Sequence, residues 1–303
     1  MLDRVEAIAA AIEASLHGRA QQPGRRPDVI VGLIGRGIQQ SRTPAMHERE
    51  AGRLGLSCVY VLIDFDTMKL ADDDLEAVFR AVGKLGFAGV NVTYPFKQTI
   101  VPLLDDIAPE ADAIGAVNTV VFGPRVAGYN TDYWGFAESF RSRMAGVPLD
   151  RVAVFGAGGA GSAVSTALVG LGAIEVVIVD PDMSRSQTLA GRLRRAGTAR
   201  IIVADDAAAA VAGANGIVNT TPVGMAKHPG MPFPAEWLRP EQWVADIIYF
   251  PPETELLLRA RAIGCRTLPG IGMAIGQAVR AFEHFTGHTA DIAAMAEHFE
   301  AAA

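Results

Sequence analysis

The sequence predicts an α/β fold with two domains, and three observations support this prediction. The chain has 303 residues, which is enough for two domains of ordinary size. Short apolar runs alternate with segments of helical composition, and this alternation is typical of mostly parallel sheets covered by helices. A glycine-rich turn at residues 156–161 lies between one apolar run and the next helical segment. Half of all residues are hydrophobic, so the chain can bury a large core.

Composition excludes several classes of function. The net charge of −6 provides no basic surface for nucleic acid. Cys58 and Cys265 are too few for a disulfide framework, and the six histidines show no metal-ligand spacing, so we expect no metal. No apolar run reaches the roughly 18 residues of a membrane span, and the N-terminus lacks a signal-peptide pattern. We therefore expect a cytoplasmic monomer or homodimer that binds small molecules and has no nucleic-acid or membrane partner.

Residues 1–27 are predicted to form an N-terminal arm. An alanine-rich helical pattern occupies 5–16, and the cluster of proline, glycine and arginine at 18–28 favours a flexible joint. We expect an extra helix or a loosely held segment here and assign it no chemistry.

The first domain is predicted at residues 28–130. Its strands are expected at Val29–Gly35, Cys58–Asp64, 87–93 and 113–122. Its helices are expected at 45–55, at 71–86 and along 94–104. Thr43 would cap the first helix, with Pro44 in its first turn. The second helix has acids in its first turn and Lys84 near its end, which suits the helix dipole.

The second domain is predicted at residues 131–272. Asp132 starts a helix, 133–144, that is expected to connect the two domains. The strands of the second domain are expected at 152–155, Glu175–Val179, 199–204, 215–220, 242–248 and 265–268. The last segment, 273–303, contains two helices that we expect to pack back on the first domain.

The start of the second domain contains the pattern of a dinucleotide-binding turn. A strand is followed by three glycines at G-x-G-x-x-G spacing, which are Gly156, Gly158 and Gly161. A helix of small residues is expected next, at 162–171. The first glycine permits a tight turn, the second lets the backbone approach a pyrophosphate, and the third lets the helix lie close to the strand. The helix N-terminus presents free N–H groups to the phosphates. The alternative is a glycine-rich turn that binds nothing. The context favours a Rossmann-type dinucleotide-binding domain.

The residues after the next strand indicate which dinucleotide binds. Asp180 follows Glu175–Val179, and a carboxylate there accepts a hydrogen bond from a free ribose 2′-hydroxyl and repels a 2′-phosphate. Asp182 adds negative charge. Arg185 would favour a phosphate, although it could equally stack on adenine or lie in solvent. The pattern favours NAD over NADP.

Polar residues follow the predicted strands of the first domain, where open α/β sheets bind their ligands. They are Ser41, Thr43, Asn91, Thr93, Lys97, Asn118, Asn130, Thr131 and Asp132. Taken singly, each has a structural explanation, as a helix cap, a solvated lysine or an acid in a first helical turn. Together they suit a polyhydroxy carboxylic acid, with Lys97 and Asp132 available for proton transfer.

Seven motifs in this order resemble those of the shikimate/quinate dehydrogenase family. They are SRTPAMHE at 41–48, GVNVTYPFKQ at 89–98, GAVNTV at 115–120, GYNTD at 128–132, GAGGAGSA at 156–163, NTTPVGM at 219–225 and PGIGMAIGQA at 269–278. The resemblance runs from about Val29 to Phe299 and is closest to the NAD-dependent quinate/shikimate dehydrogenases. Residues 1–27 lie outside it.

The resemblance implies an oxidoreductase that interconverts shikimate and 3-dehydroshikimate, and quinate and 3-dehydroquinate, by hydride transfer between C3 and NAD(P). The substrate would lie in a cleft between the domains, with Lys97 and Asp132 as the catalytic pair. The implied substrate-binding residues are Ser41, Thr43, Asn91, Thr93, Asn118, Tyr249 and Gln277. The implied cofactor-binding residues are Gly156, Ala157, Gly158, Gly159, Ala160, Gly161, Asp180, Arg185, Met225 and Gly270.

Two departures from the biosynthetic members favour quinate catabolism over aromatic amino acid biosynthesis. Thr43 stands where those enzymes commonly have serine, and the acidic segment at Asp180 stands where they commonly have a basic residue for NADP. The alternatives are an aminoshikimate-type dehydrogenase, a methylenetetrahydrofolate dehydrogenase, or a non-catalytic regulatory protein that binds NAD and a metabolite. The motifs around Ser41 and Asp132 do not favour the second, and the presence of Lys97 and Asp132 does not favour the third.

Overall fold

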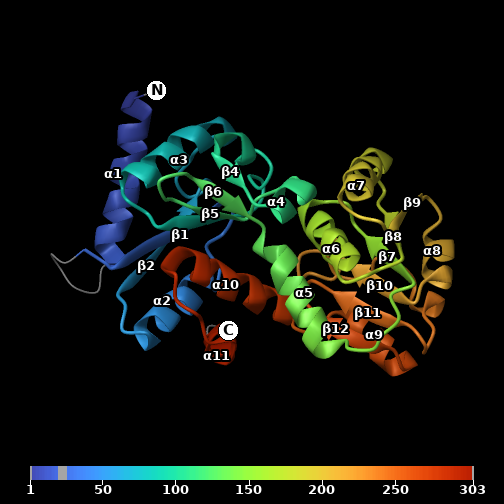
Figure 1. Ribbon diagram of the computed structural model, residues 1–303. Helices are drawn as coiled ribbons and strands as arrows, with labels where there is room; N and C mark the ends of the chain where they lie inside the picture. Colours follow the sequence, from blue (N-terminus) through green and yellow to red (C-terminus); the bar gives the residue numbers. More distant parts are fainter. Residues whose placement is uncertain (1, 20–25, 302–303) are drawn as a thin grey trace. The chain divides into compact units, whose positions relative to one another are not determined.

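The computed structural model describes residues 2–19 and 26–301. These residues form two compact units (Figure 1). Unit 1 contains the described residues up to Ala111, then Ala116–Thr131 and those from Ala278 onward, whereas unit 2 contains Asp112–Gly115 and Asp132–Gln277. The joint predicted at 18–28 falls mostly on residues 20–25, which lie outside the described residues.

Within the described residues, the sheet of unit 1 has six strands in the order β2-β1-β3-β5-β6-β4. The strands are β1 (Val29–Gly35), β2 (Cys58–Asp64), β3 (Gly89–Val92), β4 (Asp106–Ile107), β5 (Thr119–Val121) and β6 (Ala127–Tyr129). β1 pairs in parallel with β2 and β3, whereas β5 is antiparallel to β3 and β6. The carboxyl ends of β1, β2 and β3 therefore meet at one edge of the sheet.

Helices cover both faces of this sheet. They are α1 (Leu2–Arg19), α2 (Thr43–Arg53), η1 (Asp72–Asp74), α3 (Leu75–Lys84), η2 (Val101–Leu103), the first residues of α4 (Pro109–Ile114), the end of α10 (Ile271–Thr286) and α11 (Ile292–Ala301). In Figure 1, α1 and α3 lie on one side of the sheet and α2 lies on the other. The ring of His47, on α2, lies 5.0 Å from the Tyr60 ring and 5.8 Å from the Phe282 ring, so α2 and the end of α10 share the second face.

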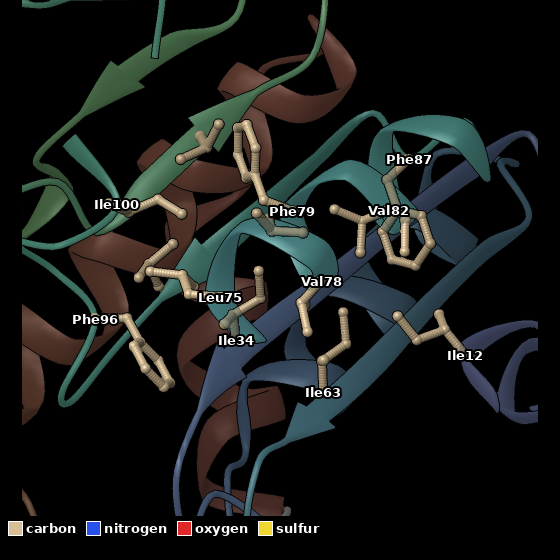
Figure 2. Packing of buried hydrophobic residues seen from close by; sticks show 14 of the residues in the cluster. Ile12, Ile34, Ile63, Leu75, Val78, Phe79, Val82, Phe87, Phe96 and Ile100 are labelled. Atoms are coloured by element: carbon tan, nitrogen blue, oxygen red, sulfur yellow. The ribbon is translucent and has the colours of Figure 1, made fainter. Parts of the chain in front are cut away.

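The hydrophobic core of unit 1 lies between the sheet and the helices α1 and α3. Figure 2 shows side chains of α3 gathered against strands β1 and β2, with α1 alongside. The residues labelled there are Ile12, Ile34, Ile63, Leu75, Val78, Phe79, Val82, Phe87, Phe96 and Ile100. Ion pairs join the same two helices and η1, since Arg4 pairs with Asp74 at 2.7 Å and Glu6 with Lys84 at 2.5 Å. The predicted extra N-terminal helix is therefore part of the core of unit 1.

Three local predictions for unit 1 were wrong. Residues 94–104 form separate turns and η2 instead of a longer helix, because Pro95 and Pro102 lack the N–H groups that a helical ladder needs. The strand predicted at 113–122 begins only at Thr119, because α4 extends to Ile114 and Gly115 ends it with a φ of +71°.

The third concerns the start of α2. Thr43 is the first residue of the helix, and the N-cap is Arg42, which makes no side-chain capping bond. The hydroxyl of Ser41 accepts the hydrogen bond from the Thr43 N–H at 3.3 Å instead.

Among the described residues, unit 2 has a sheet of six strands, all parallel, in the order β12-β11-β10-β7-β8-β9. The strands are β7 (Arg151–Phe155), β8 (Glu175–Val179), β9 (Arg200–Ala204), β10 (Gly216–Asn219), β11 (Trp243–Asp246) and β12 (Arg266–Pro269). This strand order is that of the Rossmann fold, in which the chain reverses direction beside the first strand. The prediction of a Rossmann-type domain is confirmed.

Helices cover both faces of the second sheet as well. They are α5 (Thr131–Arg143), α6 (Gly159–Gly170), α7 (Met183–Ala196), α8 (Ala207–Gly213), η3 (Ala235–Trp237), α9 (Glu255–Ile263) and part of α10. Alternate residues of β7 point to opposite faces, since Val152 and Val154 belong to one hydrophobic cluster and Ala153 and Phe155 to another. Throughout residues 2–19 and 26–301, no helix combines the length and apolar character that crossing a membrane requires.

Candidate active site

Two of the predicted substrate segments leave the sheet of unit 1 side by side. β1 and β3 are parallel neighbours, with Ile34 opposite Val92. Beyond the strands, the Thr93 N–H donates to the Ile34 carbonyl at 2.9 Å and the Arg36 N–H donates to the Tyr94 carbonyl at 3.1 Å. The loop that leads to Ser41 and the segment that carries Thr93 are therefore held together at one edge of the sheet.

A glycine permits this close approach. A Cβ atom added to Gly35 would lie 2.4 Å from the side-chain methyl of Thr93, which is too close for any side chain. Thr93 itself is half-buried, as are Ser41 and Thr43. The arrangement places three hydroxyl-bearing residues on the segments that follow β1 and β3.

Asn91 and Asn118 lie in one buried hydrogen-bond network. The Tyr60 hydroxyl donates to Asn91 Oδ1 at 2.8 Å, and Asn91 Nδ2 donates to the Thr119 hydroxyl at 3.0 Å. Asn118 Oδ1 accepts hydrogen bonds from the Thr131 N–H at 2.7 Å and from the Thr131 hydroxyl at 3.1 Å. These bonds fix the orientation of both amides, because each amide oxygen faces a donor within unit 1.

Hydrogen bonds to Val117 and Asn118 hold the backbone at Lys97 and just before Asp132. Lys97 is half-buried in the turn after β3, and its carbonyl accepts a hydrogen bond from the Val117 N–H at 2.8 Å. Asp132 is half-buried in the first turn of α5, directly after Thr131. The backbone of Lys97 is thus anchored to Val117, and Thr131, the residue before Asp132, is anchored to the neighbouring Asn118.

The glycine-rich turn of unit 2 has the geometry that a pyrophosphate site needs. Gly156 has a φ of +103°, which favours glycine, and its N–H donates to the Val179 carbonyl at 2.8 Å. A Cβ atom on Gly161 would lie 2.0 Å from the Gly156 carbonyl oxygen, so the helix can approach the strand only with glycine here. A Cβ atom on Gly158 would have no neighbour within 4 Å, so space is open above this residue.

Helix α6 begins directly after this open position. Gly158 is its N-cap, so the helix starts at Gly159, three residues before the predicted start. Ala160 and Gly159 are partly exposed at the first turn, where unpaired N–H groups and the helix dipole favour an anion. The turn is thus fitted to hold the phosphates of a dinucleotide.

Asp180 and Arg185 lie on either side of Asp182 at the start of α7. Asp180 Oδ2 accepts a hydrogen bond from the Ala157 N–H at 2.7 Å and Oδ1 accepts one from the Asp182 N–H at 2.8 Å. Arg185 pairs with Asp182 at 3.3 Å and is largely exposed. The hydroxyl of Ser184 and neighbouring N–H groups lower the pKa of Asp182, so this second carboxylate keeps its charge.

The remaining predicted residues of unit 2 lie on segments after β10, β11 and β12. Met225 and Tyr249 are exposed, and Gln277 Nε2 donates to the Ala274 carbonyl at 3.1 Å within α10. A Cβ atom on Gly270 would lie 2.2 Å from the Ile247 carbonyl oxygen, so this glycine lets the segment before Tyr249 lie against the start of α10.

Sequence reasoning missed two buried carboxylates that end parallel strands. Asp64 ends β2 and Asp246 ends β11, and each is 1% exposed. Asp246 accepts hydrogen bonds from Asn219 Nδ2 at 3.1 Å and from the Thr254 hydroxyl at 2.7 Å, and burial raises its pKa to about 6. The available signal was an acidic residue at the end of an apolar strand, which is the same pattern that indicated Asp180.

Comparisons with known proteins extend over both units. A family model described as "Shikimate dehydrogenase substrate binding domain" matches residues 33–120, and one described as "Shikimate 5'-dehydrogenase C-terminal domain" matches residues 270–298. A "Shikimate dehydrogenase (NADP(+))" of Streptomyces avermitilis is 50% identical over 266 residues, which cover 86% of this chain and 91% of the relative. A "Quinate/shikimate dehydrogenase (NAD(+))" of Corynebacterium glutamicum is 44% identical over 276 residues, which cover 89% of this chain and 98% of the relative.

A solved structure has the same fold over nearly the whole chain. It is described as "Quinate dehydrogenase from Corynebacterium glutamicum in complex with NAD" and matches with a TM-score of 0.86 and 43% identity, over 90% of this chain and 99% of that one. With the identities of the curated relatives, this similarity shows that the chain belongs to the shikimate/quinate dehydrogenase family of NAD(P)-dependent oxidoreductases.

Proposed function

We propose that this enzyme oxidises shikimate and quinate at C3 with NAD, and reduces the corresponding 3-dehydro acids in the reverse direction. Unit 1, with the predicted domain 28–130 and the returning segment 273–303, would bind the substrate. Unit 2, with the predicted domain 131–272, would bind the dinucleotide. The observation that carries the proposal is the sheet edge of unit 1, where the Ser41 loop and Thr93 leave hydrogen-bonded neighbouring strands.

Hydroxyl groups on these segments suit the substrate carboxylate and ring hydroxyls. Ser41 Oγ accepts a hydrogen bond from the Thr43 N–H, so its own proton can be donated to a carboxylate oxygen. Thr43 supplies a second hydroxyl, and Thr93 and the amide nitrogen of Asn118 would donate to ring hydroxyls. Asn91 holds its neighbours Tyr60 and Thr119 in the same network. Tyr249 and Gln277 are proposed to complete the substrate site.

Lys97 and Asp132 are proposed to handle the proton of the C3 alcohol. In the oxidation, the neutral Lys97 amine takes the hydroxyl proton while the hydrogen on C3 leaves with both electrons of its bond, which produces the ketone. Bound NAD supplies the acceptor for that hydride. Asp132 would hold the hydroxyl and the lysine in place. In the reverse direction the Lys97 ammonium returns the proton to the oxygen as C3 is reduced.

The preference for NAD over NADP is proposed from the charges beside the ribose position. Both oxygens of Asp180 are oriented by backbone N–H groups, and their remaining lone pairs can accept from a ribose hydroxyl. A 2′-phosphate would meet the negative charges of Asp180 and Asp182, while Arg185 already pairs with Asp182. The relatives named above include both NAD and NADP enzymes, so they do not decide between the two cofactors. The proposed preference for NAD therefore rests on the charges of this chain.

Initial rates with purified enzyme test the proposal. Shikimate and quinate are each supplied with NAD and with NADP, and reduced cofactor is followed at 340 nm, the usual wavelength for reduced nicotinamides. We expect turnover of both acids with NAD and at least a tenfold lower kcat/KM with NADP, about 1.4 kcal/mol of discrimination. Turnover of shikimate alone with NADP would overturn the assignments of Asp180 and Thr43, and no turnover in any combination would overturn the proposed reaction.

A further inference from the structure

Asp64 lies at the carboxyl end of β2 and faces the loop that carries Ser41. Its side chain is 1% exposed, although a carboxylate is normally left in water. Its two oxygens accept hydrogen bonds from donors in two segments, residues 37–39 and residues 66–67. The donors are the Gly37 N–H at 3.0 Å, the Ile38 N–H at 3.2 Å, Gln39 Nε2 at 2.9 Å, the Asp66 N–H at 3.1 Å and the Thr67 hydroxyl at 3.4 Å.

The loop is shaped to receive this carboxylate. Gly37 has a φ of +63°, a left-handed conformation that turns two successive N–H groups, those of Gly37 and Ile38, toward the same anion. Burial is the largest single influence and by itself raises the pKa of Asp64. The hydrogen bonds from Gln39, Asp66, Gly37 and Ile38 outweigh it and hold that pKa below its usual value. With its pKa held below the usual value, Asp64 is ionised at neutral pH.

A continuous series of hydrogen bonds leads from Asp64 to Ser41. Asp64 binds the N–H of Ile38, and the carbonyl of Ile38 accepts a hydrogen bond from the Ser41 N–H at 3.0 Å. The hydroxyl of Ser41 in turn accepts from the Thr43 N–H. The position of Asp64 thus determines where the turn begins that presents both hydroxyls.

Arg36 fixes the other side of the same loop. Its guanidinium pairs with Asp66 and Asp72, each at 2.6 Å, and donates to the Leu70 carbonyl at 2.9 Å. The last residue of β2 therefore holds the Ser41 loop at residues 37–39, and the segment after β2 holds it at Arg36. The ion pairs are partly exposed, whereas Asp64 is buried directly beneath the turn.

We infer that Asp64 is a positioning residue for substrate binding, because its buried carboxylate sets the loop that presents Ser41 and Thr43 to the substrate carboxylate. This inference rests on the proposed role of those two hydroxyl groups. It assigns Asp64 no contact with the substrate. Its effect should appear in the affinity for the acid and not in the affinity for the dinucleotide, which the other unit is proposed to bind.

The test is Asp64→Asn in the full-length enzyme, measured with shikimate and NAD. The substituted amide turns an N–H₂ group toward the donors of the loop, so at least one of them loses its acceptor. We expect KM for shikimate to rise about tenfold or more, with kcat changed less than about threefold and KM for NAD unchanged. A second substitution, Gln39→Glu on top of Asp64→Asn, gives the new amide an acceptor and should recover part of the lost affinity.

Asp74→Asn is the matched control, because the partners of Asp74 are Arg4 and the Ala71 N–H, which lie outside the loop of residues 36–43. It should leave KM for shikimate unchanged. Should Asp64→Asn fail to fold, Gln39→Ala decides the question, since it removes one donor to Asp64 and should raise the same KM by a smaller factor.

Three results would overturn the inference. The first is an unchanged KM for shikimate in both Asp64→Asn and Gln39→Ala. The second is a lower KM for shikimate in Asp64→Asn, which would show that the Asp64 carboxylate repels the substrate. The third is a rise in KM for NAD together with an equal fall in kcat, which would show a general structural defect. Ser41→Ala distinguishes this failure from failure of the proposed anchor. If Ser41→Ala raises KM for shikimate and Asp64→Asn does not, the anchor stands and the inference about Asp64 is wrong. If Ser41→Ala has no effect, the proposed anchor itself is wrong.

Discussion

Asn118 holds the first residue of helix α5, because its side-chain oxygen accepts hydrogen bonds from both the N–H and the hydroxyl of Thr131, at 2.7 and 3.1 Å. The next residue is Asp132, the proposed partner of the catalytic lysine. One buried amide, 4% exposed, thus orients the helix start with its oxygen and leaves its nitrogen as the donor proposed for a ring hydroxyl.

The two functions of Asn118 can be separated by substitution. Asn118→Ala removes the acceptor at the helix start and should lower the free energy of unfolding by about 1–2 kcal/mol and reduce kcat. Asn118→Asp keeps the acceptor but removes the donor, so it should retain most of the stability and raise KM for shikimate. Chemical denaturation and steady-state kinetics on both variants check this. Equal effects of the two substitutions on stability and on KM would contradict the division of roles.

Lys97→Ala should lower kcat by a factor of about 10² to 10⁴, because the variant has no group to take the C3 hydroxyl proton. KM for NAD should stay near the wild-type value. Lys84→Ala is the matched control, since Lys84 pairs with Glu6 on α1 and belongs to no proposed site. Undiminished turnover in Lys97→Ala would remove Lys97 from the mechanism.

Two glycines of the dinucleotide turn should respond in opposite ways to alanine. A Cβ atom on Gly158 meets nothing within 4 Å, so Gly158→Ala should fold with an unchanged melting temperature and raise KM for NAD about tenfold or more, by occupying the pyrophosphate position. A Cβ atom on Gly161 would lie 2.0 Å from a backbone oxygen, so Gly161→Ala should lose more than about 2 kcal/mol of stability. Thermal unfolding and cofactor titration distinguish the two. A Gly158→Ala variant with normal affinity for NAD would place the phosphates elsewhere.

Asp180→Asn should shift the cofactor preference. The amide can still accept from the Ala157 N–H through its oxygen, but the charge that repels a 2′-phosphate is gone. We expect the ratio of kcat/KM for NAD to that for NADP to fall about tenfold, equivalent to about 1.4 kcal/mol. Arg185→Ala serves as comparison and should change this ratio little, because Arg185 pairs with Asp182. No change in Asp180→Asn would refute the electrostatic basis of the preference.

The buried carboxyl of Asp246 should make stability depend on pH. Burial raises its pKa from 3.8 to about 6 in the folded enzyme, so folding favours the protonated form. The stability that the protonated Asp246 carboxyl gives the folded enzyme is fully present below about pH 4 and is lost as pH rises through about 6. The free energy of unfolding of the wild type should therefore fall relative to Asp246→Asn across that interval, by on the order of 1–3 kcal/mol.

Denaturant unfolding of both proteins at pH 4, 5, 6 and 7 measures this difference. Burial also lowers the pKa of His47 to about 3, which acts in the opposite direction, since its contribution is lost as pH falls below the ordinary histidine value. His47 is present in both proteins, so its effect cancels in the comparison. A constant difference from pH 4 to 7 would show that Asp246 does not titrate in this range.

Features that depend on neighbouring residues in the chain were predictable from the sequence. The strands Val29–Gly35, Cys58–Asp64 and Glu175–Val179 were predicted with the bounds that the structure has, because each is a short apolar run between polar or turn residues. The glycine-rich turn was equally local, since a positive φ at Gly156 and the space above Gly158 follow from the spacing of glycines between a strand and a helix.

Features that depend on distant partners were decided only by the tertiary structure. Sequence spacing could not show that Asp64 accepts hydrogen bonds from residues 37–39, because the contact exists only once β1 and β2 pair. The same holds for α1, whose weakly amphipathic alanine-rich pattern did not reveal that Val5, Ile8 and Ile12 complete the core of unit 1. Local propensity specifies which segments form strands, helices and turns. The burial of a charge or a helix depends on packing between residues that the chain brings together from far apart.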